Sequence, residues 1–232
     1  MTKSHCLSLL ISRLSATGRA YSAIAMVLYF ATASFNTCQA ASDTARQFHY
    51  QVHHPVFGDI GTYSNTVETA ADITTVLTSV HLKVAALGVV LHREDAERTE
   101  RWKAGRLVYF RGVTTTNEQV VEVKGEARGD TFSIISPFGN VTAPATVLPS
   151  NPSSANLLRS TIIMRTDTGK IEQVHISAGE PAFVNVGGTD ILARKYQIDG
   201  SIPYKIWIDQ QNTPVMFTVD DDSGEIYFTL AK

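Results

Sequence analysis

The stretch Val76-Leu-Thr-Ser-Val-His-Leu-Lys-Val84 alternates apolar and polar side chains along its length. One side of an extended chain would carry Val76, Val80, Leu82 and Val84, and the other would carry Ser79, His81 and Lys83. Successive side chains of a β-strand point to opposite faces of the sheet, so this period of two indicates a strand with one buried and one solvated face.

The same alternation recurs near the C-terminus, in Val215/Phe217/Val219 and in Ile226/Phe228/Leu230. Turn signals such as Ala104-Gly105, Gly129-Asp130 and Gly187-Gly188 separate the runs. Strands that follow one another at short intervals with glycine turns between them are typical of antiparallel pairing. The sequence therefore predicts an all-β fold, a strongly curved antiparallel sheet or half-open β-barrel.

Two segments depart from this pattern. Residues 94–102 are rich in charge but lack apolar partners at helical spacing, so we expect an exposed strand that runs into a hairpin at Ala104-Gly105. Four prolines lie between positions 137 and 156, where a ladder of backbone hydrogen bonds is disfavoured. We expect a loop or crossover there, preferably an exposed loop within a single β domain over residues 41–232, with a boundary between two domains as the alternative.

The first forty residues have a different composition. Lys3, Arg13 and Arg19 are their only charged side chains, and an apolar run follows from Ala20 to Phe35. The run is shorter than the roughly 20 residues that a membrane-spanning helix needs, and small residues precede a cleavage site at Ala40. Residues 1–40 are thus predicted to be a signal peptide, with an uncleaved anchor as the alternative, and the mature chain is expected to be periplasmic or secreted.

Cleavage would change the chemistry of the chain. Both cysteines, Cys6 and Cys38, lie in the leader, so the mature chain would form no disulfide and use no cysteine nucleophile. Removing 3 of the 20 basic side chains leaves 17 against 22 acidic ones, a net charge of −5. This charge argues against nucleic acid and anionic membrane surfaces as partners.

The segment Phe48-His-Tyr-Gln-Val-His-His-Pro55 holds three of the seven histidines. If it is a strand, four residues span about 13 Å, whereas two nitrogens on one zinc ion lie within about 4 Å of each other. His49 and His53 therefore cannot share a metal ion, and the adjacent His53 and His54 would point to opposite faces. We expect exposed or hydrogen-bonded histidines and assign no metal ligand.

No catalytic or cofactor-binding residue is assigned either, because the common nucleophile, phosphate-loop and dinucleotide motifs are absent from the sequence. The acidic segment from Asp220 to Glu225 is expected to be a hairpin turn, since it lacks the spacing of a calcium loop. Glu97 with Glu100, or Asp209 with Asp220, could pair for acid and base chemistry only if the fold brings them together.

Large aromatic residues are spread through several predicted strands: Trp102, Tyr109, Phe110, Tyr196, Tyr204, Trp207 and Phe217. They could line an apolar cleft on the concave side of the sheet, for which we select Trp102, Phe110, Tyr196 and Trp207. The alternative is that they fill an ordinary core.

Several of these segments resemble one family. They are Glu100-Arg-Trp-Lys-Ala-Gly-Arg-Leu107, Thr116-Asn117, Ile206-Trp-Ile-Asp209 and Asp222-Ser-Gly-Glu-Ile-Tyr227. In this order they resemble a bacterial exported family of unknown function, numbered six-one-three-four, from about Tyr50 to Leu230. The chain departs from that pattern at Ala155 and Ile208, where aromatics are expected. The layout is also distantly similar to the lipoprotein-localisation half-barrels, whose concave face takes acyl chains beneath covering helices, an analogy of fold alone.

Three functions follow from this reading. The first is a non-enzymatic periplasmic protein that binds lipid or another hydrophobic envelope molecule, with no cofactor. The second is a structural or protein-interaction module with a filled core, and the third is an enzyme that uses loop carboxylates or histidines. An unfilled apolar cavity favours the first, and a packed interior favours the second.

Overall fold

The computed structural model describes residues 45–221 and 224–231, which are almost entirely β-strand. The strands are β1 (Arg46–His54), β2 (Gly58–Ala70), β3 (Ile73–Ala86), β4 (Val89–Lys103), β5 (Arg106–Thr116), β6 (Gln119–Arg128), β7 (Thr131–Ser136), β8 (Gly139–Pro144), β9 (Leu148–Pro149), β10 (Ile162–Met164), β11 (Ile171–Gln173), β12 (His175–Ile176), β13 (Glu180–Val186), β14 (Thr189–Asp199), β15 (Tyr204–Ile208), β16 (Pro214–Asp221) and β17 (Gly224–Leu230). A short 3-10 helix, η1, spans Ala155–Arg159. The predicted leader lies outside the described residues.

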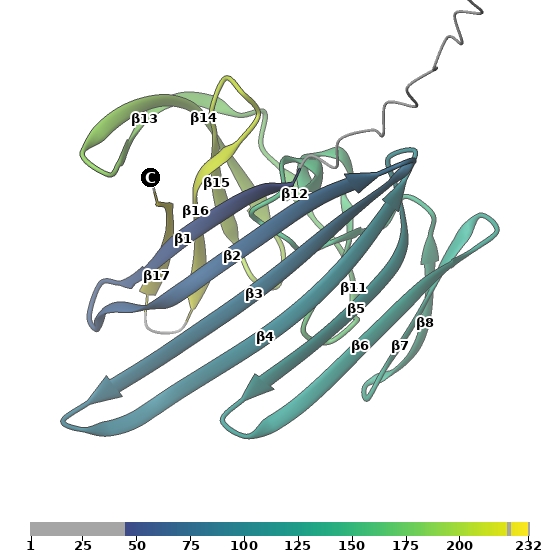
Figure 1. The fold of residues 1–232 in the computed structure, drawn as a ribbon, viewed down its shortest axis with the longest axis horizontal. Helices are drawn as coiled ribbons and strands as arrows, with labels where there is room; N and C mark the ends of the chain where they lie inside the picture. Colours follow the sequence, from purple (N-terminus) through teal and green to yellow (C-terminus); the bar gives the residue numbers. More distant parts are fainter. Residues whose placement is uncertain (1–44, 222–223, 232) are drawn as a thin grey trace, which may run out of the picture. The chain divides into compact units, whose positions relative to one another are not determined.

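Fourteen strands form one antiparallel sheet, in the order β12-β14-β15-β16-β17-β1-β2-β3-β4-β5-β6-β7-β8, with β13 paired to β14 (Figure 1). The first and last long strands meet in its middle, where Tyr50 of β1 lies opposite Leu230 of β17. Among the described strands, β8 and β12 end the sheet without pairing to each other, so the sheet is open. The predicted all-β fold on an antiparallel sheet is confirmed.

The sheet curls around its inner face. In sheet order β3 and β15 are separated by four strands, yet side chains from both line one cavity. The alternation predicted for β3 is confirmed, because Val80 is buried on the inner face while His81 is exposed on the outer face. Right-handed strand twist accumulates over so many strands and supports this curvature.

The chain must cross the inner face to pass from β8, at one edge of the sheet, to β12 at the other. Residues 145–174, here called the crossover segment, make this passage and contain β9, η1, β10 and β11. Leu157 and Ile163 of the segment join the core beneath β1–β4 and β14–β17. Val147 and Met164 join a second core beneath β4–β8.

The prediction of an exposed loop over residues 137–156 is wrong in two respects. Residues 139–144 form β8, which pairs with β7, and Leu148–Pro149 pairs in parallel with β10. Ser150, Asn151 and Ser153 are buried rather than exposed. Burial is tolerated because these polar side chains have hydrogen-bond partners: Asn151 and Ser153 bond to the sheet, and Ser150 bonds to the Thr166 amide within the crossover segment.

The expected strand over residues 94–102 is confirmed, and it ends at the hairpin of Ala104 and Gly105 as predicted. The expectation that this strand is exposed is wrong. Ala96, Glu100 and Trp102 are all buried. The strand belongs to β4, which lies between β3 and β5, and its inward positions are covered by the crossover segment.

Gly61 provides a test of the bend between β1, β2 and β3. It has φ +153°, and a Cβ built there would lie 1.9 Å from the backbone carbonyl oxygen of His81 on β3. Since a side chain would both strain the backbone and push the strands apart, we expect Gly61→Ala to lower the free energy of unfolding by at least about 2 kcal/mol. Urea unfolding followed by tryptophan fluorescence measures this change.

Gly58→Ala is the matched control at the start of the same strand. Gly58 also has positive φ, at +74°, but no atom lies within 4 Å of the added carbon. We expect a cost of about 1 kcal/mol, from backbone conformation alone. Equal costs for the two variants would contradict the close contact between β2 and β3.

Candidate functional site

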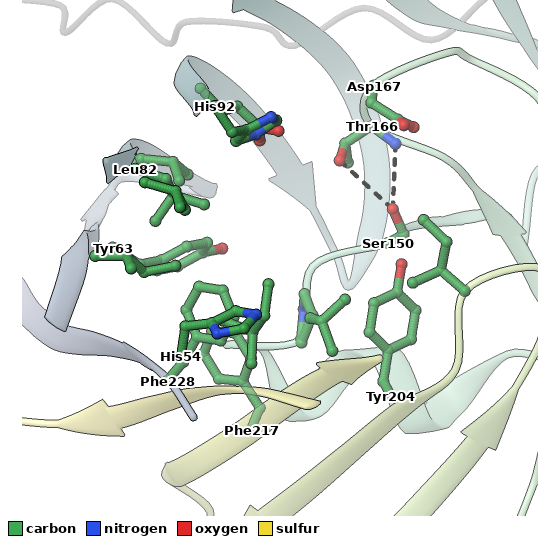
Figure 2. Close-up of a pocket in the computed structure, with 18 of the residues that line it drawn as sticks. His54, Tyr63, Leu82, His92, Ser150, Thr166, Asp167, Tyr204, Phe217 and Phe228 are labelled. Carbon is green, nitrogen blue, oxygen red and sulfur yellow. Dashed lines mark hydrogen bonds between the residues drawn. The ribbon is translucent and has the colours of Figure 1, made fainter. Parts of the chain in front are cut away.

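A cavity of about 500 Å³ lies on the inner face of the sheet. Strands β1–β4 form one wall, β15–β17 form the opposite wall, and the crossover segment closes one end (Figure 2). Its apolar surface comes from alternate positions of these strands: Val80, Leu82, Val84, Phe217, Val219 and Phe228. The cavity is therefore a product of curvature, because it joins strands that are not neighbours in the sheet.

Aromatic rings make the floor rigid. Phe217 and Phe228 stack with their centroids 4.4 Å apart, and Tyr63 meets Phe217 edge-on at 5.4 Å. The Tyr50 hydroxyl, beneath them, donates a 2.8 Å hydrogen bond to the carbonyl of Pro214. Such contacts hold the rings in place without a ligand, so the apolar part of the cavity is preformed.

The other end of the cavity is polar. Ser150 Oγ accepts a 3.1 Å hydrogen bond from the Thr166 amide, and Tyr204 and Asp167 lie beside it (Figure 2). Arg165 donates from Nε to Asp167 at 3.0 Å and also contacts the second carboxylate oxygen. Burial pushes the pKa of Asp167 up, but its bonds to Arg165 outweigh this and leave the pKa below its usual range. The two residues thus form a neutral ion pair at pH 7.

A buried polar network fixes the crossover segment beside the cavity. Asn151 Nδ2 donates to Glu100 Oε1 at 2.9 Å, and Trp102 Nε1 donates to Glu100 Oε2 at 3.0 Å. The Tyr63 hydroxyl donates to Asn151 Oδ1 at 2.9 Å, and Ser153 Oγ lies 2.6 Å from the same oxygen. Burial raises the pKa of Glu100 to about 7, although its hydrogen bonds oppose the rise. Each side chain from the crossover segment in this network is thereby paired with the sheet.

The histidines are dispersed by the strand geometry, as their spacing predicts. His49 and His53 are exposed, and His53 Nδ1 lies 3.1 Å from Asp59 Oδ1. His54 points to the opposite face, is 1% exposed and lines the cavity. Its Nδ1 accepts a 3.0 Å hydrogen bond from the Val56 amide. Within residues 45–221 and 224–231, no group of three His, Cys, Asp or Glu side chains could hold a metal ion.

The carboxylate pairs considered from the sequence are not brought together. Glu97 and Glu100 lie on opposite faces of β4, one exposed and one buried. Asp209 caps its own turn by accepting a 2.8 Å hydrogen bond from the Thr213 amide, whereas Asp220 lies at the far end of β16. The hairpin predicted over residues 220–225 is confirmed by the pairing of Asp220 with Glu225.

The four aromatic residues selected from the sequence are dispersed as well. Trp102 and Phe110 are buried in the second core, and Trp207 packs on the outer face beneath β13. Tyr196 lines a separate cavity of about 390 Å³ with Pro181 and other residues of β13–β15. None of the four lines the larger cavity, which takes Tyr204 and Phe217 from the wider aromatic set.

Sequence reasoning also missed His54, Tyr63 and Phe228 as lining residues. His54 and Phe228 have the same parity as the buried Val52 and the half-buried Ile226 on their strands, so the face of each could be predicted from alternation. Tyr63 follows a β-bulge between β1 and β2 that resets the parity of β2, which alternation alone does not reveal.

Comparison with known proteins agrees with this fold. The family described as Domain of unknown function (DUF6134) matches residues 58–231. Matching solved structures include a β-barrel-like protein of Domain of Unknown Function DUF1849 from Brucella abortus, with a TM-score of 0.59 and 11% identity, covering 82% of this chain and 96% of that chain. No curated protein matches. In the part of the chain that is described, no helix has the length and hydropathy of a membrane span.

Glu100 predicts a pH dependence of stability. Its pKa is about 7 in the fold against 4.5 for an ordinary glutamate, so the folded chain binds the proton more tightly. The stability that this group contributes is present below pH 4.5 and is lost as the pH rises to 7, a change of about 3 kcal/mol. We expect Glu100→Gln to remove this dependence, measured by urea unfolding between pH 4.5 and about pH 8.

Glu97→Gln is the control, because Glu97 lies on the exposed face of the same strand. It should keep the pH dependence of the unchanged chain. If Glu100→Gln also keeps it, Glu100 does not hold its proton as described.

Proposed function

We propose that this chain, which belongs to the DUF6134 family, is a non-enzymatic exported protein that binds a hydrophobic or lipid-like molecule in the larger cavity. The observation that carries this proposal is the preformed apolar space of about 500 Å³ between β3–β4 and β15–β17. Small-molecule sites typically measure about 300–1,000 Å³ and are mostly apolar. The bacterial periplasm or exterior is the proposed location, where the predicted signal peptide would deliver the mature chain.

Burial of an alkyl chain supplies the driving force. Each methylene moved from water into such a cavity is worth about 0.8 kcal/mol, or roughly fourfold in affinity. The stacked rings of Phe217 and Phe228 offer a fixed surface, so little ordering of the protein opposes binding. A flexible chain fits this irregular space between strands better than a rigid polar solute does.

The cavity favours binding over the two other functions considered from the sequence. A module with a filled interior would leave no such space, whereas here a cavity opens beside the core beneath β1–β4 and β14–β17. An enzyme would need reacting groups in contact, but His92 and Glu94 line the cavity without a hydrogen bond between their side chains. Arg165 and Asp167 are committed to each other.

The proposal is tested first with neutral ligands. N-phenyl-1-naphthylamine, an uncharged fluorophore, should bind the purified mature chain at one site, and decanol and dodecanol should displace it. We expect dodecanol to bind about 15-fold more tightly than decanol, because two more methylenes are buried. Fluorescence titration measures both affinities, and a chain that binds none of the three compounds would refute the proposal.

The site is tested by filling it. Leu82 lines the cavity, and Lys83 points outward from the next position of β3. We expect Leu82→Trp to weaken binding of the fluorophore at least about 10-fold, because the larger side chain occupies ligand space. Lys83→Trp should leave it unchanged. Equal binding by both variants would place the ligand elsewhere.

A further inference from the structure

One cation in the wall of the cavity has a buried donor that finds no hydrogen-bond partner among the described residues. Arg98 of β4 lines the cavity, and its Nε is buried without a hydrogen bond. No ion pair joins its guanidinium to a carboxylate of the described residues within 4.0 Å. A buried donor that has lost water without gaining a partner is unfavourable, and more so when it belongs to a charged group. The unsatisfied Nε of Arg98 contrasts with the other guanidinium of the cavity wall, Arg165, which is hydrogen-bonded to Asp167.

The neighbouring charges do not neutralise Arg98. Glu100 and Asp167 are near enough to feel its field, but their oxygens accept hydrogen bonds from other residues. Glu94, four residues earlier on the same strand, is about 13 Å away along the backbone. Arg165, the other guanidinium in the wall, is already paired with Asp167. Arg98 is thus the cation left to face the cavity.

We propose that Arg98 binds the anionic oxygen head group of an amphiphile whose apolar tail occupies the cavity. This inference rests on the proposed function and names its ligand class. A guanidinium presents several N–H donors in a fixed fork that matches the oxygens of a carboxylate or a phosphate. The buried Nε would gain the acceptor that the protein does not give it. The tail would extend towards Leu82 and the rings of Phe217 and Phe228.

The site accounts for both parts of such a molecule. Polar groups of Ser150 and Tyr204 lie at the same end of the cavity as Asp167, away from the rings of Phe217 and Phe228 (Figure 2). Charge-assisted hydrogen bonds are roughly twice as strong as neutral ones and gain further strength where water is excluded. The head group therefore adds orientation and selectivity to affinity that comes mainly from the tail.

The test compares two ligands that differ only in the head group. Dodecanoate and dodecanol are titrated against the bound fluorophore at about pH 8, below their aggregation limits. We expect the unchanged chain to bind dodecanoate at least about 10-fold more tightly than Arg98→Met does. Dodecanol should bind the two proteins within about twofold of each other, which also shows that the variant keeps a folded cavity.

Two further variants sharpen the result. Arg101→Met removes a guanidinium from the outer face of the same strand, where it lies over the Tyr109 ring, and should not change either affinity. Arg98→Lys keeps the charge but loses the planar fork, so it should recover only part of the dodecanoate affinity. Dodecyl phosphate is titrated in the same way to compare a phosphate with a carboxylate head group. The ligand whose affinity falls more in Arg98→Met carries the head group that Arg98 prefers.

The outcomes separate this inference from the proposed function. If the unchanged chain binds neither dodecanoate nor dodecanol, the proposed function fails. If it binds both and Arg98→Met weakens neither, or weakens both equally, the cavity binds apolar chains but Arg98 does not recognise an anion. Loss of dodecanoate binding alone supports the assignment.

Discussion

The hydrogen bond from Asn151 to Glu100 ties the crossover segment to the inner face of the sheet, and the interior depends on it. A polar segment with prolines enters a core only when the sheet satisfies its polar atoms. Tyr63 and Asn65 extend the same network to Asn151 and Ser153. The segment thereby packs into both cores of the concave face, and it closes one end of the cavity that lies beside the core of β1–β4 and β14–β17.

Much of the fold could be predicted from the alternation of apolar and polar residues, because each strand has one face towards the interior. The pattern around Val80 identified β3 and its buried side, and glycine turns marked the hairpins. The pairing between β1 and β17 could not be predicted, because it joins residues 50 and 230 and no local sequence pattern indicates it. Burial of Ser150 and Asn151 also escaped prediction, because their composition is that of a loop and their partners lie on distant strands.

The site was less predictable than the fold for the same reason. Its lining comes from alternate positions of strands that are distant in the sequence. Aromatic character alone therefore did not distinguish Phe217, which lines the cavity, from Phe110, which is buried in the second core. Histidine spacing correctly placed His53 and His54 on opposite faces, yet what His54 faces depends on the curl of the sheet. Arg98 resembles its exposed neighbours on a charged strand until its inward position is known.

A curled sheet, a buried crossover segment and a guanidinium with an unsatisfied Nε are the features on which we base the proposal that the cavity binds an amphiphile. Native mass spectrometry of the mature chain, exported with its own leader and purified without detergent, tests this most directly. We expect a bound species with the mass of an anionic amphiphile, present in the Lys83→Trp protein and absent from Leu82→Trp. A chain that carries no small molecule, or one retained equally by both variants, would contradict the central claim that the cavity is a ligand site.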